Sequence, residues 1–359
     1  MARLTTSQEE KIERYLREYY EDREFPALRY QYEVWRQSRP LEGMRVLEAT
    51  PIFRNTLAKY LALSLAGAEV MVSVSPEIMS DASIVASLPD WGIGVTRSPE
   101  LEGCFDVILD CAGGHSALEP EVGYVELTRS GVEKYEDAVK PVFLADAGRI
   151  KEIETCLGTG ESFLRAMRHF GYADLRGRLV VVFGYGKVGR GVVMYALKAG
   201  ARVAVVDALD KSEQVPEGVD FVLLEDHDVV KRVLNVAFCL VTVTGVRHAL
   251  HGKVDWEPVL SSGILLTNMG VEDEYGPEVP DSRVLNGKFS LNFALPEPTL
   301  MRYIETTMAL DNAGAVELAT GRDRYQAGII KPSPELENLY LDIVRREGLI
   351  ADELLMAGL

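Results

Sequence analysis

Three glycines with the spacing G-x-G-x-x-G carry the clearest chemical signal in this chain. Gly184, Gly186 and Gly189 directly follow the apolar run LVVVF and lead into the helical pattern KVGRGVVMYALK. A strand that turns into a helix through such glycines lets the backbone approach a pyrophosphate, whose charge then lies at the helix N-terminus. The pattern predicts a dinucleotide site, and the turn residues expected to contact the dinucleotide are Gly184, Tyr185, Gly186, Lys187, Val188 and Gly189.

An acidic residue at the end of the next strand completes this pattern. The run RVAVVD ends in Asp207, 18 residues beyond Gly189, where a carboxylate accepts hydrogen bonds from the hydroxyls of an adenosine ribose. No arginine that could pair with a 2′-phosphate occurs from Ala208 to Ser212, and a carboxylate repels such a phosphate. The sequence therefore predicts NAD, and not NADP, as the cofactor.

The composition is that of a globular protein with an acidic surface. A length of 359 residues with 47% hydrophobic content is enough for two domains with buried cores. The net charge of −17 repels the phosphate backbone of nucleic acids and anionic lipid head groups. No apolar stretch approaches the roughly 20 residues of a membrane helix, and the polar start MARLTTSQEEKIERY is not a signal peptide. We expect a cytoplasmic protein with a small-molecule substrate that binds neither nucleic acid nor membrane.

The cysteines and histidines do not indicate disulfides or a metal site. His248 and His251 have the spacing H-x-x-H, but no third ligand accompanies them, so we expect no bound metal. The cysteines contain no C-x-x-C pair, which favours free thiols in a reducing compartment; they are Cys104, Cys111, Cys156 and Cys239.

The order of the elements predicts an α/β fold with two domains. Two helices within residues 7–38 precede the predicted strands MRVLEA, EVMVSV, GIGVTR and FDVILD, and further strands lie near FVLL, CLVTVTG and GILLTNMG after the glycine-rich turn. From Pro296 the pattern is helical again and can return to cover the first domain. We expect an α/β substrate-type domain from residues 1–150 and 297–345, a Rossmann-type NAD-binding domain from residues 151–296, and a C-terminal tail from residues 346–359.

Several segments, in one order, resemble the adenosylhomocysteinase family from about residue 10 to about residue 320. FDVILDCAGG is similar to the family's "ILDDGG", YVELTRSGV to "SEETTTGV", and FGYGKVGRG to "AGYGDVGKG". LVTVTG and LLTNMG are similar to "VTTTG" and "CNIG" in the second half of the cofactor domain. The last two matches add Thr242, Thr244, Gly245 and Asn268 to the expected cofactor-binding residues.

The resemblance implies two α/β domains joined by a hinge, NAD held between them, and a homo-oligomer, either a dimer or a tetramer. In that family, bound NAD oxidises the 3′-hydroxyl of the substrate's ribose. Homocysteine is then eliminated, water is added, and the hydride returns, so that the overall reaction is a hydrolysis. This chemistry needs a base and groups that grip the ribose hydroxyls.

The substrate side of the resemblance is incomplete. Ile150 stands where the family has its catalytic lysine, and Lys151 follows one position later. The ribose-gripping glutamate falls at Leu127, and the substrate histidine falls at Pro51. Since several acid–base groups are replaced together, we do not expect the standard hydrolysis of S-adenosylhomocysteine.

The residues left to carry chemistry come from four loops expected in the cleft between the domains: Cys111–Ser116, Glu126–Arg129, Asp146–Glu154 and Asn268–Asp273. Glu126 and Asp146 match family positions, and Glu154 replaces a family aspartate; either of the first two can instead cap a helix. His115 follows two glycines after a strand, which suits a mobile acid or base, or a solvated loop histidine.

Three functions remain open at this point. The first is an NAD-dependent enzyme that transfers a hydride to or from a small polar substrate, such as a nucleoside or a hydroxy acid. The second is a protein without chemistry that senses NAD or NADH, and the third is an unorthodox S-adenosylhomocysteine hydrolase. The four candidate catalytic residues are Glu126, Asp146, Glu154 and His115.

Overall fold

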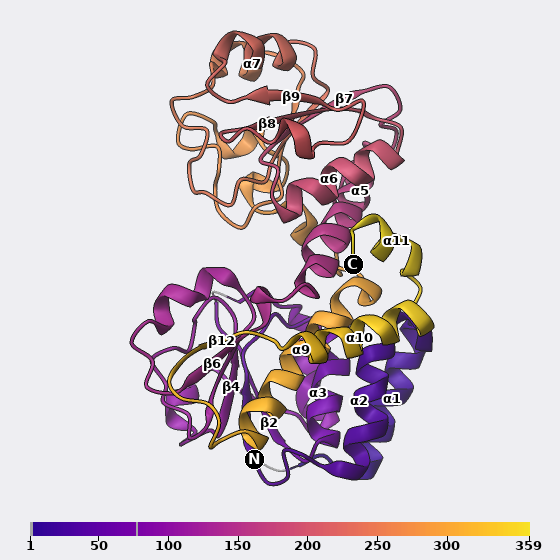
Figure 1. Cartoon of the computed structure of the whole chain (residues 1–359), viewed down its shortest axis with the longest axis vertical. Coiled ribbons are helices and arrows are strands. Elements are labelled where there is room, and N and C mark those ends of the chain that lie inside the picture. The colour runs from indigo at the N-terminus through magenta and orange to yellow at the C-terminus, as the bar shows by residue number, and fades with distance from the viewer. Residues whose placement is uncertain (1–2, 77) are drawn as a thin grey trace. The chain divides into compact units, whose positions relative to one another are not determined.

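The computed structural model describes residues 3–76 and 78–359 and divides the chain into two compact units (Figure 1). Unit 1 consists of Met1–Ile153 and Leu300–Leu359, and unit 2 consists of Glu154–Thr299. Each unit contains its own parallel sheet with helices, which confirms the predicted α/β fold with two domains. Since the second piece of unit 1 follows unit 2 in the sequence, unit 2 is inserted into unit 1.

Unit 1 is built on seven parallel strands in the order β12-β6-β5-β4-β1-β2-β3. The sequence pattern predicted the first four in chain order, but not β5, β6 or β12. Each of these three has only three or four residues. The strands are β1 (Arg45–Glu48), β2 (Glu69–Ser73), β3 (Gly94–Thr96), β4 (Val107–Asp110), β5 (Gly123–Glu126), β6 (Pro141–Leu144) and β12 (Gly328–Ile330).

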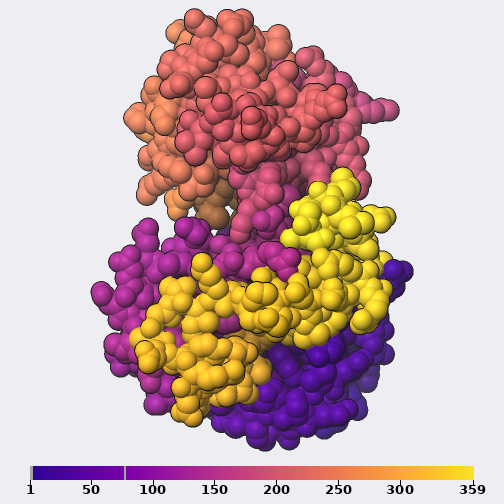
Figure 2. Space-filling view, in the orientation of Figure 1, coloured from indigo at the N-terminus to yellow at the C-terminus, as the bar shows by residue number. Residues whose placement is uncertain are grey.

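Two buried helices of unit 1 pack against each other, as can be followed in Figure 1. Every residue of α3 (Thr56–Leu65) is buried, and α9 (Met301–Thr320) is buried over most of its length. The C-terminal helices α10 and α11, yellow in Figure 2, lie at the surface of this unit. The remaining helices of unit 1 are α1 (Thr6–Tyr19), α2 (Pro26–Ser38), α4 (Ala82–Ser87), α10 (Pro334–Glu347) and α11 (Ala351–Met356).

A carboxylate on α9 caps the start of α2, in the N-terminal part of unit 1. The carboxylate of Glu305 accepts hydrogen bonds from the backbone N–H groups of Ala27 and Leu28, each at 3.1 Å, and so caps the start of α2. The first N–H groups of a helix have no partner within the helix, so a carboxylate at this position is stabilising. The second piece of the chain thus supplies a cap that the first piece lacks.

Unit 2 is built on five parallel strands in the order β11-β10-β7-β8-β9. β7 is buried at every residue, as expected for a central strand of a parallel sheet. The strands are β7 (Leu179–Phe183), β8 (Arg202–Asp207), β9 (Asp220–Leu223), β10 (Cys239–Thr242) and β11 (Leu265–Asn268). The helices are α5 (Thr159–His169), α6 (Lys187–Lys198), α7 (His227–Leu234) and α8 (Trp256–Ser261).

Three further observations bear on the class of protein. All four cysteines are free thiols in the structure. Within residues 3–76 and 78–359, no group of three or more His, Cys, Asp or Glu side chains is arranged to hold a metal ion. No helix in the same residues combines the length and the apolar character that crossing a membrane requires.

Candidate functional site

Each sheet has one position at which the order of strand addition reverses, so that the next strand is added on the opposite side of the first one. In unit 2, the chain runs from β7 to β8 and β9 on one side, whereas β10 lies on the other side of β7. In unit 1, it runs from β1 to β2 and β3, whereas β4 lies on the other side of β1. Ligands of open α/β sheets bind outside the carboxyl ends of the strands at such a position. The loops after β7 and β10, and those after β1 and β4, are therefore the expected ligand-binding positions.

Each of the three glycines in the turn after β7 meets a different structural requirement. Gly184 has a φ of +102°, and a Cβ atom on it would lie 2.7 Å from the carbonyl oxygen of Val243, beyond the end of β10. A Cβ atom on Gly189 would overlap the carbonyl of Gly184, so this glycine lets α6 pack against the turn. A Cβ atom on Gly186, in contrast, would meet nothing within 4 Å. The middle glycine therefore faces open space, where a phosphate group can approach the backbone.

The start of α6 adjoins this open space. Its N-cap residue is Gly186, and no side chain caps the helix there. Lys187 and Val188 form its first turn, and Val188 packs against the core of unit 2. An uncapped helix N-terminus beside a glycine turn is suited to a negatively charged phosphate.

Asp207 lies at the end of β8, beside the same turn. Its Oδ2 atom accepts hydrogen bonds from the N–H of Tyr185 at 2.7 Å and from Nζ of Lys211 at 2.9 Å, and Oδ1 accepts one from the N–H of Leu209 at 3.0 Å. Partial burial opposes ionisation, but these hydrogen bonds and the lysine charge hold the pKa of Asp207 below its usual value. The residue is therefore an ionised acceptor at neutral pH. Together with the glycine turn, it forms a Rossmann-type dinucleotide site that fits NAD.

Thr242 and Asn268, at the ends of β10 and β11, are fully buried and bind each other. Oγ1 of Thr242 donates to Oδ1 of Asn268 at 3.0 Å, and Nδ2 of Asn268 donates to the carbonyl oxygens of Glu272 and Lys288 at 2.7 Å each. Both side chains thus hold the loop after β11 in place. The expectation that they contact the cofactor remains a prediction.

The loop after β10 contains the two other predicted residues, Thr244 and Gly245. Their N–H groups donate to the two carboxylate oxygens of Glu274, each at 2.7 Å. Glu274 is fully buried, and burial raises its pKa despite these hydrogen bonds. This glutamate was not predicted from the sequence, because it stands 29 residues or more from its partners in the chain.

At the corresponding position of unit 1, a chain of three hydrogen-bonded side chains crosses the carboxyl end of the sheet. Nε2 of His115 lies 2.9 Å from Oγ of Ser73, at the end of β2, and Nδ1 lies 3.3 Å from Oδ1 of Asp110, at the end of β4. Oδ2 of Asp110 also accepts hydrogen bonds from the hydroxyl of Tyr135 at 2.5 Å and from the N–H of His115 at 2.8 Å. A carboxylate on one ring nitrogen and a hydroxyl on the other is an arrangement that can move a proton.

Glu126, at the end of β5, anchors the loop that carries His115 by hydrogen bonds to its backbone. Its carboxylate accepts hydrogen bonds from the N–H groups of Ala112 and Gly113, each at 3.0 Å, and from the N–H and hydroxyl of Thr128 at 2.8 and 2.6 Å. Burial raises the pKa of Glu126 to about 7, against the effect of the Thr128 hydrogen bonds. The structure thus places one predicted catalytic residue, Glu126, against the loop that carries another, His115.

The other two predicted catalytic residues lie elsewhere. Asp146 is half-buried in the short turn Ala145–Ala147 after β6 of unit 1. Glu154 is half-buried in the π-helical turn Ile153–Gly158 and is the first residue of unit 2. The hydrogen bonds of the His115 chain described above involve neither residue, so their catalytic role remains a prediction.

A buried charge cluster in unit 1 was not predicted. Nζ of Lys59, on α3, forms ion pairs with both Glu48, at the end of β1, and Asp311 on α9, and all three are almost completely buried. Burial raises the pKa of Asp311 to about 6, although the charges of Lys59 and Lys151 act in the opposite direction. Lys151 itself is 3% exposed, so the lysine next to the lost family lysine belongs to the interior of unit 1.

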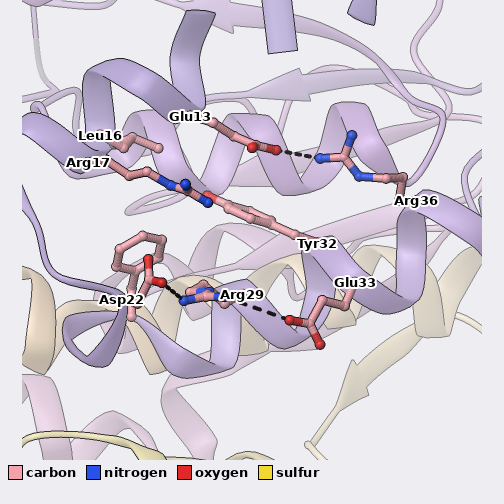
Figure 3. A pocket seen from close by; sticks show the side chains of 9 residues that line it. Glu13, Leu16, Arg17, Asp22, Arg29, Tyr32, Glu33 and Arg36 are labelled. Carbon is pink, nitrogen blue, oxygen red and sulfur yellow. Dashed lines mark hydrogen bonds and ion pairs between the residues drawn. The ribbon is translucent and has the colours of Figure 1, made fainter. Parts of the chain in front are cut away.

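A surface cavity of about 160 Å³ lies between α1 and α2 (Figure 3). Its walls carry both signs of charge, and most of the charges pair with each other: Arg29 with Asp22 and Glu33, and Arg36 with Glu13. These pairs neutralise most of the charged lining without a ligand. We therefore place the candidate site at the strand ends and not in this cavity.

Curated relatives of this chain include proteins named adenosylhomocysteinase. No protein-family model matches the chain. The chain is similar to an adenosylhomocysteinase from Thermoplasma acidophilum, with 26% identity over 289 residues that cover 71% of this chain and 67% of that protein. It is also similar to an S-inosyl-L-homocysteine hydrolase from Methanopyrus kandleri, with 24% identity over 90% of this chain and 81% of that protein.

Solved structures support the fold. A dipicolinate synthase chain from Bacillus halodurans superimposes with a TM-score of 0.51 and 15% identity, over 77% of this chain and 99% of that one. The resemblance stated from the sequence motifs is confirmed by the curated relatives, which carry it over most of the chain. The chain thus resembles adenosylhomocysteinases in sequence over most of its length.

Proposed function

We propose that unit 2 binds NAD and that the protein transfers a hydride between this cofactor and a small polar substrate, such as a nucleoside or a hydroxy acid. The observation that carries the proposal is the turn after β7, in which Gly186 faces open space between two sterically required glycines, with the ionised Asp207 beside it. The turn and the helix start would hold the pyrophosphate, and Asp207 would accept a hydrogen bond from the adenosine ribose. Bound NAD supplies a hydride acceptor.

Unit 1 supplies the acid–base groups in this proposal. A substrate hydroxyl that replaces Oγ of Ser73 as the partner of Nε2 would pass its proton to His115. Asp110 would hold the ring through Nδ1 and stabilise the imidazolium that forms. Glu126 is then a positioning residue, because it fixes the backbone of the loop that carries His115. Asp146 and Glu154 are further candidates for contact with the substrate.

Cofactor binding is tested directly by titrating the purified protein with NADH and following the nucleotide's fluorescence. We expect saturable binding, and we expect the variant Gly186→Val to weaken it at least about tenfold, because the side chain fills the space that the phosphate needs. Gly263→Val is a matched control, since a Cβ atom on Gly263 also meets nothing within 4 Å and its φ is not positive. Absence of NADH binding by the well-folded wild-type protein would overturn the proposal.

Hydride transfer is tested by the change in absorbance of NAD or NADH with a panel of nucleosides and 2-hydroxy acids. We expect at least one substrate class to react, and Asp110→Asn to lower kcat while NADH binding stays unchanged. A protein that binds NADH but reacts with no member of either class would instead be an NAD(H) sensor.

A second candidate function is hydrolysis of an S-nucleosyl-homocysteine. The names of the curated relatives favour it, whereas Ile150, in the family's lysine position, opposes it. It is tested by measuring thiol release from S-adenosyl- and S-inosyl-homocysteine. Thiol release at a rate proportional to enzyme concentration would favour this function over net oxidation.

A further inference from the structure

We infer that Lys211 sets the cofactor specificity of unit 2 and that the protein accepts NADP(H) as well as NAD(H). The inference rests on the proposed function and deepens it. NADP was not expected from the sequence, because the loop after Asp207 has no arginine and because the carboxylate of Asp207 repels a 2′-phosphate. The structure shows that a lysine of this loop lies directly against the carboxylate on which that exclusion was based.

The position of Lys211 is fixed by two acceptors. Nζ donates to Oδ2 of Asp207 at 2.9 Å and to the carbonyl oxygen of Tyr185, in the glycine turn, at 3.3 Å. The side chain of Lys211 is 21% exposed and that of Asp207 is 9% exposed. A pair this sheltered is screened less than a surface ion pair, so each charge cancels a large part of the other's field.

Lys211 and Asp207 each have hydrogen-bonding capacity left. Together they can bind a ribose whose 2′ position carries either a hydroxyl or a phosphate. Of the three N–H groups of the ammonium of Lys211, two have acceptors and one remains. Oδ1 of Asp207 accepts a hydrogen bond from the N–H of Leu209 and can accept a second. A 2′-hydroxyl can therefore donate to Asp207 and accept from Lys211 at the same time.

A 2′-phosphate uses the lysine differently. It cannot donate to Asp207, but it can pair with the ammonium of Lys211, whose long flexible stem allows it to follow the phosphate. The ion pair also offsets the repulsion that an isolated Asp207 would exert. Two more carboxylates of the loop, those of Asp210 and Glu213, are exposed and keep the local charge negative. NAD(H) should therefore remain the preferred form, by a modest factor.

The test compares NADH and NADPH binding to the full-length protein by fluorescence titration. For the wild type we expect both to bind, with NADPH weaker by no more than about thirtyfold. In Lys211→Ala, NADPH binding should fall by a further tenfold or more, because the 2′-phosphate loses its cation. NADH binding should change less than about threefold, because the neutral 2′-hydroxyl loses one hydrogen bond but keeps its bond to Asp207. In Asp207→Ala, where the lysine is released, the preference should move toward NADPH.

Lys231→Ala is the matched control, since Nζ of Lys231 also lies 2.9 Å from an aspartate, Asp255, in unit 2 but away from the turn. It should leave both affinities unchanged. Binding of NADH with no measurable binding of NADPH, or an unchanged NADPH-to-NADH ratio in Lys211→Ala, would overturn this inference and leave the proposed function intact. Binding of neither nucleotide by the wild type would overturn both.

Discussion

The buried carboxylate of Glu126 makes the stability of unit 1 depend on pH in a direction that can be worked out from its environment. Burial raises the pKa of Glu126 in the folded chain to about 7, whereas an exposed glutamate titrates near 4.5. The folded state therefore binds the proton more tightly, so this residue's contribution to stability falls as the pH rises from about 4.5 to about 7 and is constant above. Between pH 5 and pH 8, the linkage corresponds to about 2 to 3 kcal/mol.

The perturbation is Glu126→Gln, which cannot ionise. Its amide oxygen can keep the hydrogen bonds from Ala112 and Thr128, but its NH₂ group then faces the N–H of Gly113. This mismatch costs about 1 to 3 kcal/mol at every pH. The variant should consequently be less stable than the wild type at pH 5. At pH 8 the two should have similar stability, because the wild type has by then lost a similar amount of stability through the ionisation of Glu126. The wild-type curve should fall by about 2 to 3 kcal/mol more than the variant curve over this range.

The assay is urea denaturation at several pH values, followed by tryptophan fluorescence. Trp256→Phe as a common background removes the single tryptophan of unit 2, so that Trp35 and Trp91 report on unit 1 alone; this separation is needed because two units do not unfold as one two-state system. Glu100→Gln, at an exposed glutamate, is the control and should parallel the wild type. If the stability curve of Glu126→Gln also parallels that of the wild type from pH 5 to pH 8, the reasoning from burial is refuted.

Two further substitutions test the packing of the glycine turn and the charge cluster. Gly184→Ala should destabilise unit 2 by about 2 to 4 kcal/mol, because the residue has φ +102° and its Cβ would lie 2.7 Å from the carbonyl oxygen of Val243; urea denaturation followed by the tryptophan of unit 2 measures it, and an unchanged midpoint would contradict the steric argument. Lys59→Met leaves the buried carboxylates of Glu48 and Asp311 without their cation and should cost unit 1 about 3 to 5 kcal/mol at pH 8. The loss should be smaller below pH 6, since the pKa of Asp311 is raised to about 6; a loss that is independent of pH would show that packing and not charge is responsible.

The parts of the molecule that could be predicted from the sequence are those encoded locally. The strand, the three glycines and the helix after them are contiguous, and Asp207 follows at a spacing set by one helix and one strand. These elements and NAD as cofactor were predicted because each geometric requirement selects a particular residue type. The α/β fold class could be predicted for the same reason, because its strands and helices are also encoded in contiguous segments.

The polar networks could not be predicted, because their members are far apart in the chain. Ser73 and His115 are 42 residues apart, and their contact depends on β2 and β4 lying on either side of β1. Glu305 reaches its partners across 277 residues or more. Lys211 is different: it stands four residues from Asp207, but the sequence pattern does not reveal whether a lysine points toward a carboxylate or into solvent.

The insertion of unit 2 within unit 1 has a consequence for synthesis on the ribosome. All residues of unit 2 have been made before α9 exists, so this unit has its complete sequence while unit 1 is still unfinished. The start of α2 lacks its cap until the nascent chain has grown past residue 305, and Lys59 lacks one of its two carboxylates until the chain has grown past residue 311. The nucleotide-binding unit can therefore fold first during translation, and the unit that begins the chain is the last to be completed.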